Sequence, residues 1–475
     1  MLGVMATQSE HECQNCKRLE AIVARQEVQI ARLEALVAEL LERIATLEKN
    51  SSNSHKPPSS DIGKPKRDKP KGGSKRSRGA QPGHKRLDRT PFSQDEIDVT
   101  VSHTLDAGCP KCGGALVPSD KDPHIFQQVE LAPKPVIITE HRAPVYWCPH
   151  CQEHHHAGFP VAVKRAGLTG PRMKAFVACL KGAFHVSYSN TQEVLQDVMG
   201  VHVSRGHLTD IIKQTSDALD PSYTELLEAL PEQTHLNVDE TGHKDSGKKF
   251  WTWVFRAPNF TVFKIDSSRG SQVLFEVLGK TFGGVLGCDY FSAYRKYMKD
   301  VGVEVQFCLA HLIRDAKYLI KIGGRNRKYG KRLLDRLREL FHTLHCREEM
   351  HPDKFQQAME IARKRLIHVA THPPWTQKAG NIAKRFRAHG ESYVRFITTP
   401  GIEPTNNLAE QALRFVVIQR RMTQGTRGAK GRTWSERIWT TVGTCRQQGR
   451  SIYDYLHRAL SAHFAGQCAP SLFSS

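Results

Sequence analysis

The sequence lacks the long apolar runs that membrane-spanning helices need. No stretch of about 18 consecutive apolar residues occurs in it. Its opening residues, MLGVMATQSEHECQNC, also lack the charged segment and following apolar segment that mark a secretory signal. These absences argue against an integral membrane protein and a secreted one. We therefore expect a soluble protein of the cytoplasm.

Acidic residues are scarce relative to basic ones. The chain has 48 Asp and Glu against 69 Lys and Arg, and its formal net charge is +21. Because Lys and Arg neutralise phosphates and release their counterions, this excess favours a polyanionic partner. Nucleic acid is the first expectation, and an anionic membrane surface is the second. At roughly 150 residues per domain, the length predicts about three domains.

The twelve cysteines include three Cys-x-x-Cys pairs, which in a chain without a secretion signal favour metal ligands or redox thiols over disulfides. Cys109 and Cys112 in GCPKCGG, with Cys148 and Cys151 in WCPHCQEHHH, predict one structural Zn²⁺ in a ribbon-like domain over 95–165. A redox dithiol is the alternative. The residues that could replace a thiolate are His150, His154, His155 and His156. Cys13 and Cys16 are free thiols or half of a site shared between two chains.

An N-terminal segment over 17–49 has a heptad pattern, and a basic linker over 50–92 follows it. The seam residues are Leu19, Val23, Ile30, Leu33, Val37, Leu40, Ile44 and Leu47, interrupted by Gln26. β-Branched residues at one seam position and Leu at the other favour a parallel two-stranded coiled coil, hence a homodimer or higher oligomer. An amphipathic helix packed on its own chain is the alternative. The linker is too poor in apolar residues to fold alone, so it is a solvated spacer, a basic arm for phosphates, or both.

The segment over 168–230 has the pattern of consecutive helices. Ser189 with Gln192 resembles a capping box, and Ser204 can cap the last helix. Two capped helices around a Gly200 turn predict a helix-turn-helix-like DNA-binding domain. Its expected DNA contacts are Arg205, His207 and Lys213. An ordinary helical bundle is the alternative.

Short strands dominate from Asn237 onward and predict an α/β sheet. Asp239 is expected to end the first strand, and Asp289 ends the fourth, in GVLGCDY. Glu410 begins a helix in EPTNNLAEQALR. Two acids at corresponding strand ends can share a site. Glu240 and Asp245 are expected to make local hydrogen bonds or supporting contacts.

Several words of the sequence resemble the insertion sequence 66 family of bacterial transposases, in the order found there, from about residue 19 to 460. They are NSSNSHKPPSSD, GAQPGHK, CPKC, CPHC, VDETGHKDSGKKFWTWVF, GCDYFSAY, CLAHLIRDAKYL and NNLAEQALR. The resemblance implies an RNase H-like DDE catalytic domain over 232–425, with a helical insertion over about 320–395 and a C-terminal helical segment over 426–475. Departures are Gln411, where Arg is frequent, and Leu309, where an aromatic residue is frequent.

The resemblance also implies a chemistry for the carboxylates. Asp239, Asp289 and Glu410 would hold two Mg²⁺ or Mn²⁺ ions about 4 Å apart, for hydrolysis and then strand transfer. The implied partners are the element's terminal repeats, target DNA and accessory proteins of the same element, and the expected further contacts are Arg414, Arg420 and Arg421. The basic insertion is a wall of the DNA channel or a solvated face.

Two other functions fit many of these features. A zinc-ribbon, helix-turn-helix regulator without catalysis would have the same charge, coiled coil and zinc pattern, and only the strand-end carboxylates with Glu410 discriminate against it. The other is an RNase H-like nuclease that cuts DNA but never joins strands.

Overall fold

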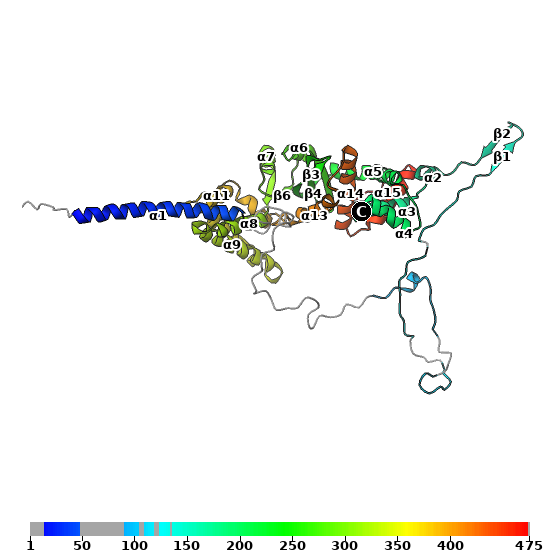
Figure 1. Ribbon diagram of the computed structural model, residues 1–475, viewed down its shortest axis with the longest axis horizontal. Coiled ribbons are helices and arrows are strands. Elements are labelled where there is room, and N and C mark those ends of the chain that lie inside the picture. The colour runs from blue at the N-terminus through cyan, green and yellow to red at the C-terminus, as the bar shows by residue number, and fades with distance from the viewer. Residues whose placement is uncertain (1–13, 48–89, 104–108, 118–122, 134, 474–475) are drawn as a thin grey trace, which may run out of the picture.

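The computed structural model describes residues 14–47, 90–103, 109–117, 123–133 and 135–473 (Figure 1). Most of the predicted linker over 50–92 and Cys13 lie outside these residues. Within the described part, no helix combines the length and the apolar character needed to cross a lipid bilayer.

A five-stranded mixed sheet forms the centre of the chain, and its position agrees with the strand-rich sequence after Asn237. The strands are β3 (His235–Asp245), β4 (Lys248–Arg256), β5 (Thr261–Asp266), β6 (Val285–Cys288) and β7 (Glu304–Phe307). Their spatial order is β5-β4-β3-β6-β7; β3, β4 and β5 pair antiparallel, whereas β3, β6 and β7 pair parallel. Because parallel neighbours start from the same edge, crossover helices precede β6 and β7. These are α6 (Gln272–Leu278) and α7 (Ser292–Val301).

Strand β3 is longer than the sequence predicts. We expected it to end at Asp239, but it continues to Asp245 because β4 pairs with it along the whole extension. Its parallel pairing with β6 is shorter and stops at Asn237, which lies opposite Gly287. Asp239 therefore lies just beyond the point where β3 and β6 separate, within a strand and not at its end.

Helices cover both faces of the sheet. On one face, Tyr294 of α7 contacts Trp253 of β4 edge to face, with ring centroids 6.0 Å apart. On the other face, Trp439 contacts Phe263 of β5 in the same manner, with centroids 6.1 Å apart. The second face carries α13 (Asn407–Thr423) and α14 (Ala429–Gln447). The predicted helix with Glu410 is α13, so this carboxylate belongs to the second face.

A group of helices precedes the sheet in the chain. It comprises α2 (Val161–Ala166), α3 (Pro171–Gly182), α4 (Tyr188–Asp197) and α5 (Arg205–Glu228), and the C-terminal α15 (Ile452–Ala465) packs against α3. Ser204 caps α5 as predicted, because its Oγ accepts a hydrogen bond from His207 N at 3.1 Å. The predicted cap Ser189 is wrong. It lies inside the first turn of α4, and Ser187, with extended backbone, accepts from Asn190 N at 3.0 Å instead.

Five α-helices separate β7 from α13. They are α8 (Leu309–Ile322), α9 (Gly324–His345), α10 (Pro352–Thr371), α11 (Gln377–His389) and the short α12 (Arg395–Thr398). The helical insertion expected over about 320–395 thus begins earlier than predicted, at α8. Helices α8 and α9 form a hairpin, and they pack closely against each other at Gly330 of α9. A Cβ atom there would lie 2.8 Å from Ala316 O and 2.9 Å from Leu319 Cβ, so the two helices approach this closely only with glycine.

The N-terminal helix α1 (Gln14–Leu47) extends away from the rest of the chain, with its last turns on the insertion (Figure 1). Glu42 forms an ion pair with Lys378 of α11 at 3.0 Å, and Thr46 Oγ1 lies 3.4 Å from the Tyr318 hydroxyl of α8. The predicted seam stays uncovered within this chain, with exposures from 48% at Leu40 to 76% at Leu47. One end of α1 thus packs on its own chain, and pairing of two such helices stays a prediction.

Candidate functional site

The three predicted carboxylates come from three elements that meet beside β3. Asp239 follows Asn237 by two residues on β3, and Asp289 follows Gly287 by two residues after β6. Since Asn237 and Gly287 lie opposite each other, and strand residues alternate between faces, the two acids leave neighbouring strands in the same direction. Glu410 lies in the first turn of α13, which packs on β3.

The charges of neighbouring carboxylates act on Asp239. Burial, followed by the charges of Glu240, Asp289 and Glu410, holds the pKa of Asp239 well above its usual range. A hydrogen bond from Glu240 N to Asp239 Oδ1, at 2.9 Å, opposes this shift without cancelling it. Asp289 Oδ1 accepts from Phe291 N at 2.8 Å, which fixes its carboxylate at the end of β6. The arrangement favours a proton or a cation at Asp239.

Glu410 is held by two residues from the first turns of α8. Arg314 Nη2 lies 3.2 Å from Glu410 Oε2, and His311 Nδ1 lies 3.8 Å from Oε1. Arg314 Nη1 also lies 3.1 Å from His311 Nε2. All three side chains are largely buried, with exposures between 13% and 23%. The start of the insertion thus forms one wall of the site.

The described residues contain two groups of three side chains whose ligand atoms all lie within 4.8 Å of one another, and one is Cys308, His311 and Glu410. This set fits a metal poorly. Arg314 can only donate, so His311 Nε2 accepts and a neutral ring then carries its proton on Nδ1, toward Glu410. Burial also raises the pKa of the Cys308 thiol to about 11. We interpret the surroundings of Glu410 as a clamp in which Arg314 donates to Glu410 and His311 supports Arg314.

A buried amide pair joins the three elements that carry the acids. Asn406, which is 1% exposed and directly precedes α13, donates from Nδ2 to Val238 O at 2.8 Å. Its Oδ1 accepts from Asn237 Nδ2 at 3.0 Å, and its backbone N–H donates to Cys308 Sγ at 3.1 Å. A Cβ on Gly287 would lie 2.6 Å from Asn237 Nδ2, so the glycine in β6 leaves the space that this pair needs. The pair fixes β3, β6 and α13 relative to one another.

Glu240 points to the opposite face of the sheet from Asp239. It accepts hydrogen bonds from the Tyr294 hydroxyl and from Arg269, whose Nη2 lies 2.7 Å from Oε1. Burial, and then the charge of Asp289, raise the pKa of Glu240 to about 7. Glu240 thus makes supporting contacts, and its partners come from distant parts of the sequence.

Asp245 ties the loop after α13 to the end of β3. It accepts from Thr426 Oγ1 and from Gly428 N, both at 2.8 Å, and pairs with Arg432. Burial raises the pKa of Asp245, but these hydrogen bonds and the Arg432 charge outweigh that effect and leave it below the usual range. Asp245 therefore makes supporting contacts, and they anchor the chain after the C-terminal end of α13 to β3.

The predicted zinc ligands form two knuckles of similar shape. Cys148 ends β1 (Val145–Cys148), and Cys151 precedes its antiparallel partner β2 (Glu153–His156). Backbone N–H groups lower the pKa of Cys148, mainly that of Cys151, and the pKa of Cys109, mainly that of Lys111. Both shifts favour the thiolate that binds metal.

The structure does not bring the two knuckles together. The second three-residue group in the described part of the chain is Cys148, Cys151 and His155, with Cys151 Sγ 3.1 Å from His155 Nε2. Cys109 and Cys112 are not part of it. His155, named from the sequence only as a substitute ligand, is thus the third member here.

Comparison with known families decides what kind of protein this is. Residues 166–433 match the family described as "Transposase IS66 family", and residues 106–152 match "zinc-finger binding domain of transposase IS66". The chain belongs to the IS66 transposase family. The matched zinc finger includes all four predicted cysteine ligands, so this transposase has a zinc-binding domain. Residues 9–90 match a family of unknown function, DUF6444.

Two uncharacterized proteins of Sinorhizobium fredii are similar to this transposase. Protein y4qI is 22% identical over 403 residues, which cover 77% of this chain and 72% of y4qI. Protein y4hP is 24% identical over 403 residues, covering 76% of this chain and 71% of y4hP.

The predicted DNA contacts of the transposase lie on two helices. On α5, Arg205 and Lys213 are exposed, whereas His207 is half-buried, with Nε2 3.0 Å from Thr169 Oγ1. On α13, Arg414 and Arg421 are exposed, whereas half-buried Arg420 donates to Thr241 Oγ1 of β3 at 3.2 Å. His207 and Arg420 thus have partners within the transposase.

Sequence reasoning missed the residues that position the acids. The words CLAHLIRDAKYL and NNLAEQALR carried the family resemblance, yet they gave no role to His311, Arg314 or Asn406. These residues act across long separations, 96 residues for Arg314 to Glu410 and 169 for Asn237 to Asn406. One signal in the sequence points to them. Asn406 lies four residues before Glu410, and His311 and Arg314 lie at or just after the Cys-x-x-His spacing that begins at Cys308.

Proposed function

We propose that this IS66 transposase cleaves and joins DNA strands by a DDE mechanism, in an RNase H-like domain with Asp239, Asp289 and Glu410 as catalytic carboxylates. The observation that supports this most is the convergence of the acids beside β3: Asp239 and Asp289 leave neighbouring strands in the same direction, and the helix that carries Glu410 packs on β3. The raised pKa of Asp239, which results from desolvation and the charges of the neighbouring carboxylates, agrees with this. The strand order, with β3 central and β6 its parallel neighbour, is consistent with that domain type. A regulator without catalysis has no need to gather three half-buried acids beside one strand.

The acids suit Mg²⁺ or Mn²⁺. Carboxylate oxygens are the ligands that these ions prefer, and a cation would relieve the repulsion that acts on Asp239. Asp239, Asp289 and Glu410 would hold two ions, which when bound stabilise the attacking and leaving oxygens of phosphodiester chemistry. Among the described residues the three acids do not form a close group with one another, since Glu410 is drawn toward α8.

The chain's own groups supply positioning and charge. The Asn237–Asn406 pair sets the spacing between the strand of Asp239 and the helix of Glu410, and Arg314 with His311 orients Glu410. Exposed Arg414 and Arg421, on the same helix as Glu410, would contact DNA phosphates beside the acids. Arg205 and Lys213 of α5 would hold the element end through the helix-turn-helix-like segment, with His207 and Arg420 as supporting residues.

Two further parts complete the proposal. Cys109, Cys112, Cys148 and Cys151 would bind one structural Zn²⁺, whose four-thiolate site requires the two knuckles to meet. The uncovered seam of α1 would pair with a second copy and so link two catalytic domains. Accessory proteins of the same element stay an expectation from the family.

The test is metal-dependent cleavage of a duplex that carries the element's end. Asp239→Asn, Asp289→Asn and Glu410→Gln should each reduce the cleavage rate at least about a thousandfold, because loss of a ligand removes several kcal/mol of charge stabilisation. Duplex binding should stay nearly unchanged.

Asp300→Asn is the matched control. Asp300 pairs with Lys296 on the outer helix α7, so this change also removes one acid but should leave cleavage intact. A catalytic variant that cleaves as fast as this control would remove that residue from the site, and normal cleavage by all three would refute the mechanism.

A further inference from the structure

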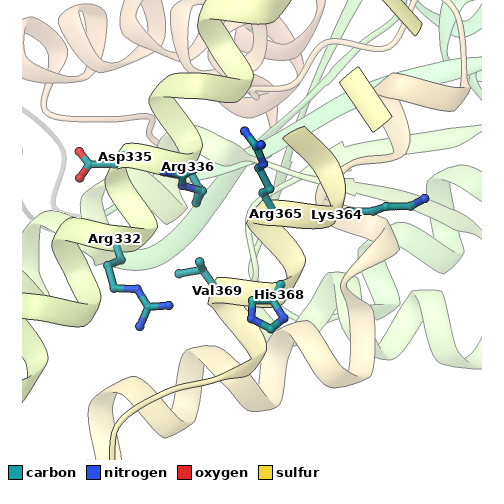
Figure 2. Close-up of a pocket in the computed structure, with 7 residues that line it drawn as sticks. All are labelled: Arg332, Asp335, Arg336, Lys364, Arg365, His368 and Val369. Atoms are coloured by element: carbon teal, nitrogen blue, oxygen red, sulfur yellow. The ribbon is translucent and has the colours of Figure 1, made fainter. Parts of the chain in front are cut away.

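A hollow of about 480 Å³ lies between α9 and α10 of the insertion, apart from the carboxylates (Figure 2). Figure 2 shows the residues that line it, with Arg332, Asp335 and Arg336 on one helix and Lys364, Arg365 and His368 on the other. Four of these six side chains carry a full positive charge, and one is acidic. The hollow is therefore a cationic groove, and we use that name for it below.

The charge of the groove is part of a wider excess. Helices α9 and α10 together carry eleven Lys and Arg against four Asp and Glu. The heads of the groove residues also reach water, with exposures of 35% at Arg336, 56% at Arg365 and 74% at Lys364. Carboxylates of the same helices offset part of this charge, since Lys364 lies 3.6 Å from Glu360, but a net positive charge remains that favours an anionic partner.

A carboxylate from α9 fixes the shape of the groove. Glu339 pairs with Arg336 on its own helix and with Arg365 of α10, the latter at 2.6 Å. Each guanidinium has five N–H donors in a planar fork, so pairing with Glu339 leaves donors for a second acceptor. Glu339 thus holds two arginines side by side without exhausting their hydrogen-bonding capacity.

Along the axis of the α8–α9 hairpin, the groove lies near the end at which α8 contacts Glu410. Gly330 of α9 packs against Ala316 and Leu319 of α8, and α9 runs back along α8 from there. Arg336 comes six residues later, about 9 Å further along the axis. That places it near the start of α8, where Arg314 contacts Glu410.

We propose that the cationic groove binds the phosphodiester backbone of duplex DNA at a place separate from the catalytic carboxylates. The inference deepens the proposed function, because it assumes that the transposase acts on DNA. An open groove along two helices, lined by exposed arginines and one lysine, suits a continuous chain of phosphates better than a small anion. Such contacts position a duplex without reading its sequence.

The DNA held there has two possible sources, the element's own end or the target. Full-length protein without divalent metal is titrated with a duplex from the element's end and with a duplex of unrelated sequence, over a range of salt concentrations. The test variant is Arg332→Ala/Lys364→Ala, which removes one exposed cation from each helix. The matched control, Lys331→Ala/Lys354→Ala, removes the same charge from the same helices outside the groove.

Loss of two phosphate contacts should reduce the slope of log affinity against log salt by about 1.8, and the affinity roughly eightfold per contact at 0.1 M salt. A loss confined to the unrelated duplex assigns target DNA to the groove, a loss confined to the element end assigns the end, and an equal loss assigns both. A test variant that binds both duplexes like the control overturns the inference. Because binding is measured without metal, that result would leave the DDE proposal standing.

Discussion

Replacing Asn406 with Ala should weaken both the fold and metal-dependent cleavage, because its amide links the elements that carry the acids. The change deletes the donor to Val238 O and the acceptor of Asn237 Nδ2, and both partners then stay buried without their bond. An unsatisfied buried polar group costs about 1–3 kcal/mol, so the free energy of unfolding should fall by roughly 2–5 kcal/mol. Stabilities of about 5–15 kcal/mol leave the variant folded at 25 °C.

A second readout separates positioning from stability. If the amide pair sets the spacing between Asp239 and Glu410, Asn406→Ala should raise the Mg²⁺ concentration needed for half-maximal cleavage. Thr444→Ala is the matched control. Thr444 is fully buried on α14, and its Oγ accepts from Thr261 N and donates to Thr261 O, both at 3.2 Å. It therefore loses two comparable bonds away from the acids.

Urea unfolding gives the free energies, and cleavage across a Mg²⁺ series gives the half-maximal concentration. Asn237→Ala/Asn406→Ala should lose less stability than the sum of its single variants, by about 1–3 kcal/mol, because the two amides share one bond. The reasoning fails if Asn406→Ala shifts the Mg²⁺ requirement no more than Thr444→Ala does, or if the two asparagine changes are additive.

Three other predictions concern separate parts of the chain. Metal analysis of the protein should find one Zn²⁺, which the variants Cys109→Ser and Cys148→Ser lose and the variant His155→Ala keeps. If His155→Ala lost the zinc and Cys109→Ser kept it, the ligands would instead be Cys148, Cys151 and His155. Deletion of residues 1–49 should turn a dimer into a monomer in sedimentation and stop the joining of paired ends, while cleavage of single ends persists; an unchanged dimer with normal joining would place the interface elsewhere. Lys174 is buried, and burial lowers its pKa from 10.5 to about 8, although the charge of Asp210 opposes this shift. Between about pH 8 and pH 10.5 the unfolded chain therefore binds more protons than the folded protein, and the free energy of unfolding rises with pH. Lys174→Met should remove that rise and stabilise the protein at neutral pH by up to about 3 kcal/mol, and a pH profile like that of the unchanged protein would contradict this.

The sequence predicted the order of elements around the acids because local patterns carry that information. The alternation in HLNVDE and the turn before NNLAEQ mark β3 and α13 without any knowledge of their neighbours. The length of β3 was not predictable in this way, since its extension to Asp245 depends on the β4 partner and on the loop at Thr426. The clamp of Arg314 and His311 on Glu410 was equally hidden, because it depends on where α8 starts relative to α13.

The position of the insertion in the chain links the carboxylate of Glu410 with the cationic groove. Helix α8 begins one residue after β7 ends, and its first turns place His311 and Arg314 against Glu410. The same helix packs against α9, which forms one wall of the cationic groove. A duplex bound in the groove as we propose would therefore contact the same helical hairpin that orients Glu410, and a loop between β7 and α13 could not connect the two in this way. We infer that the helices between Asp289 and Glu410 serve to hold DNA in a defined position relative to the acids.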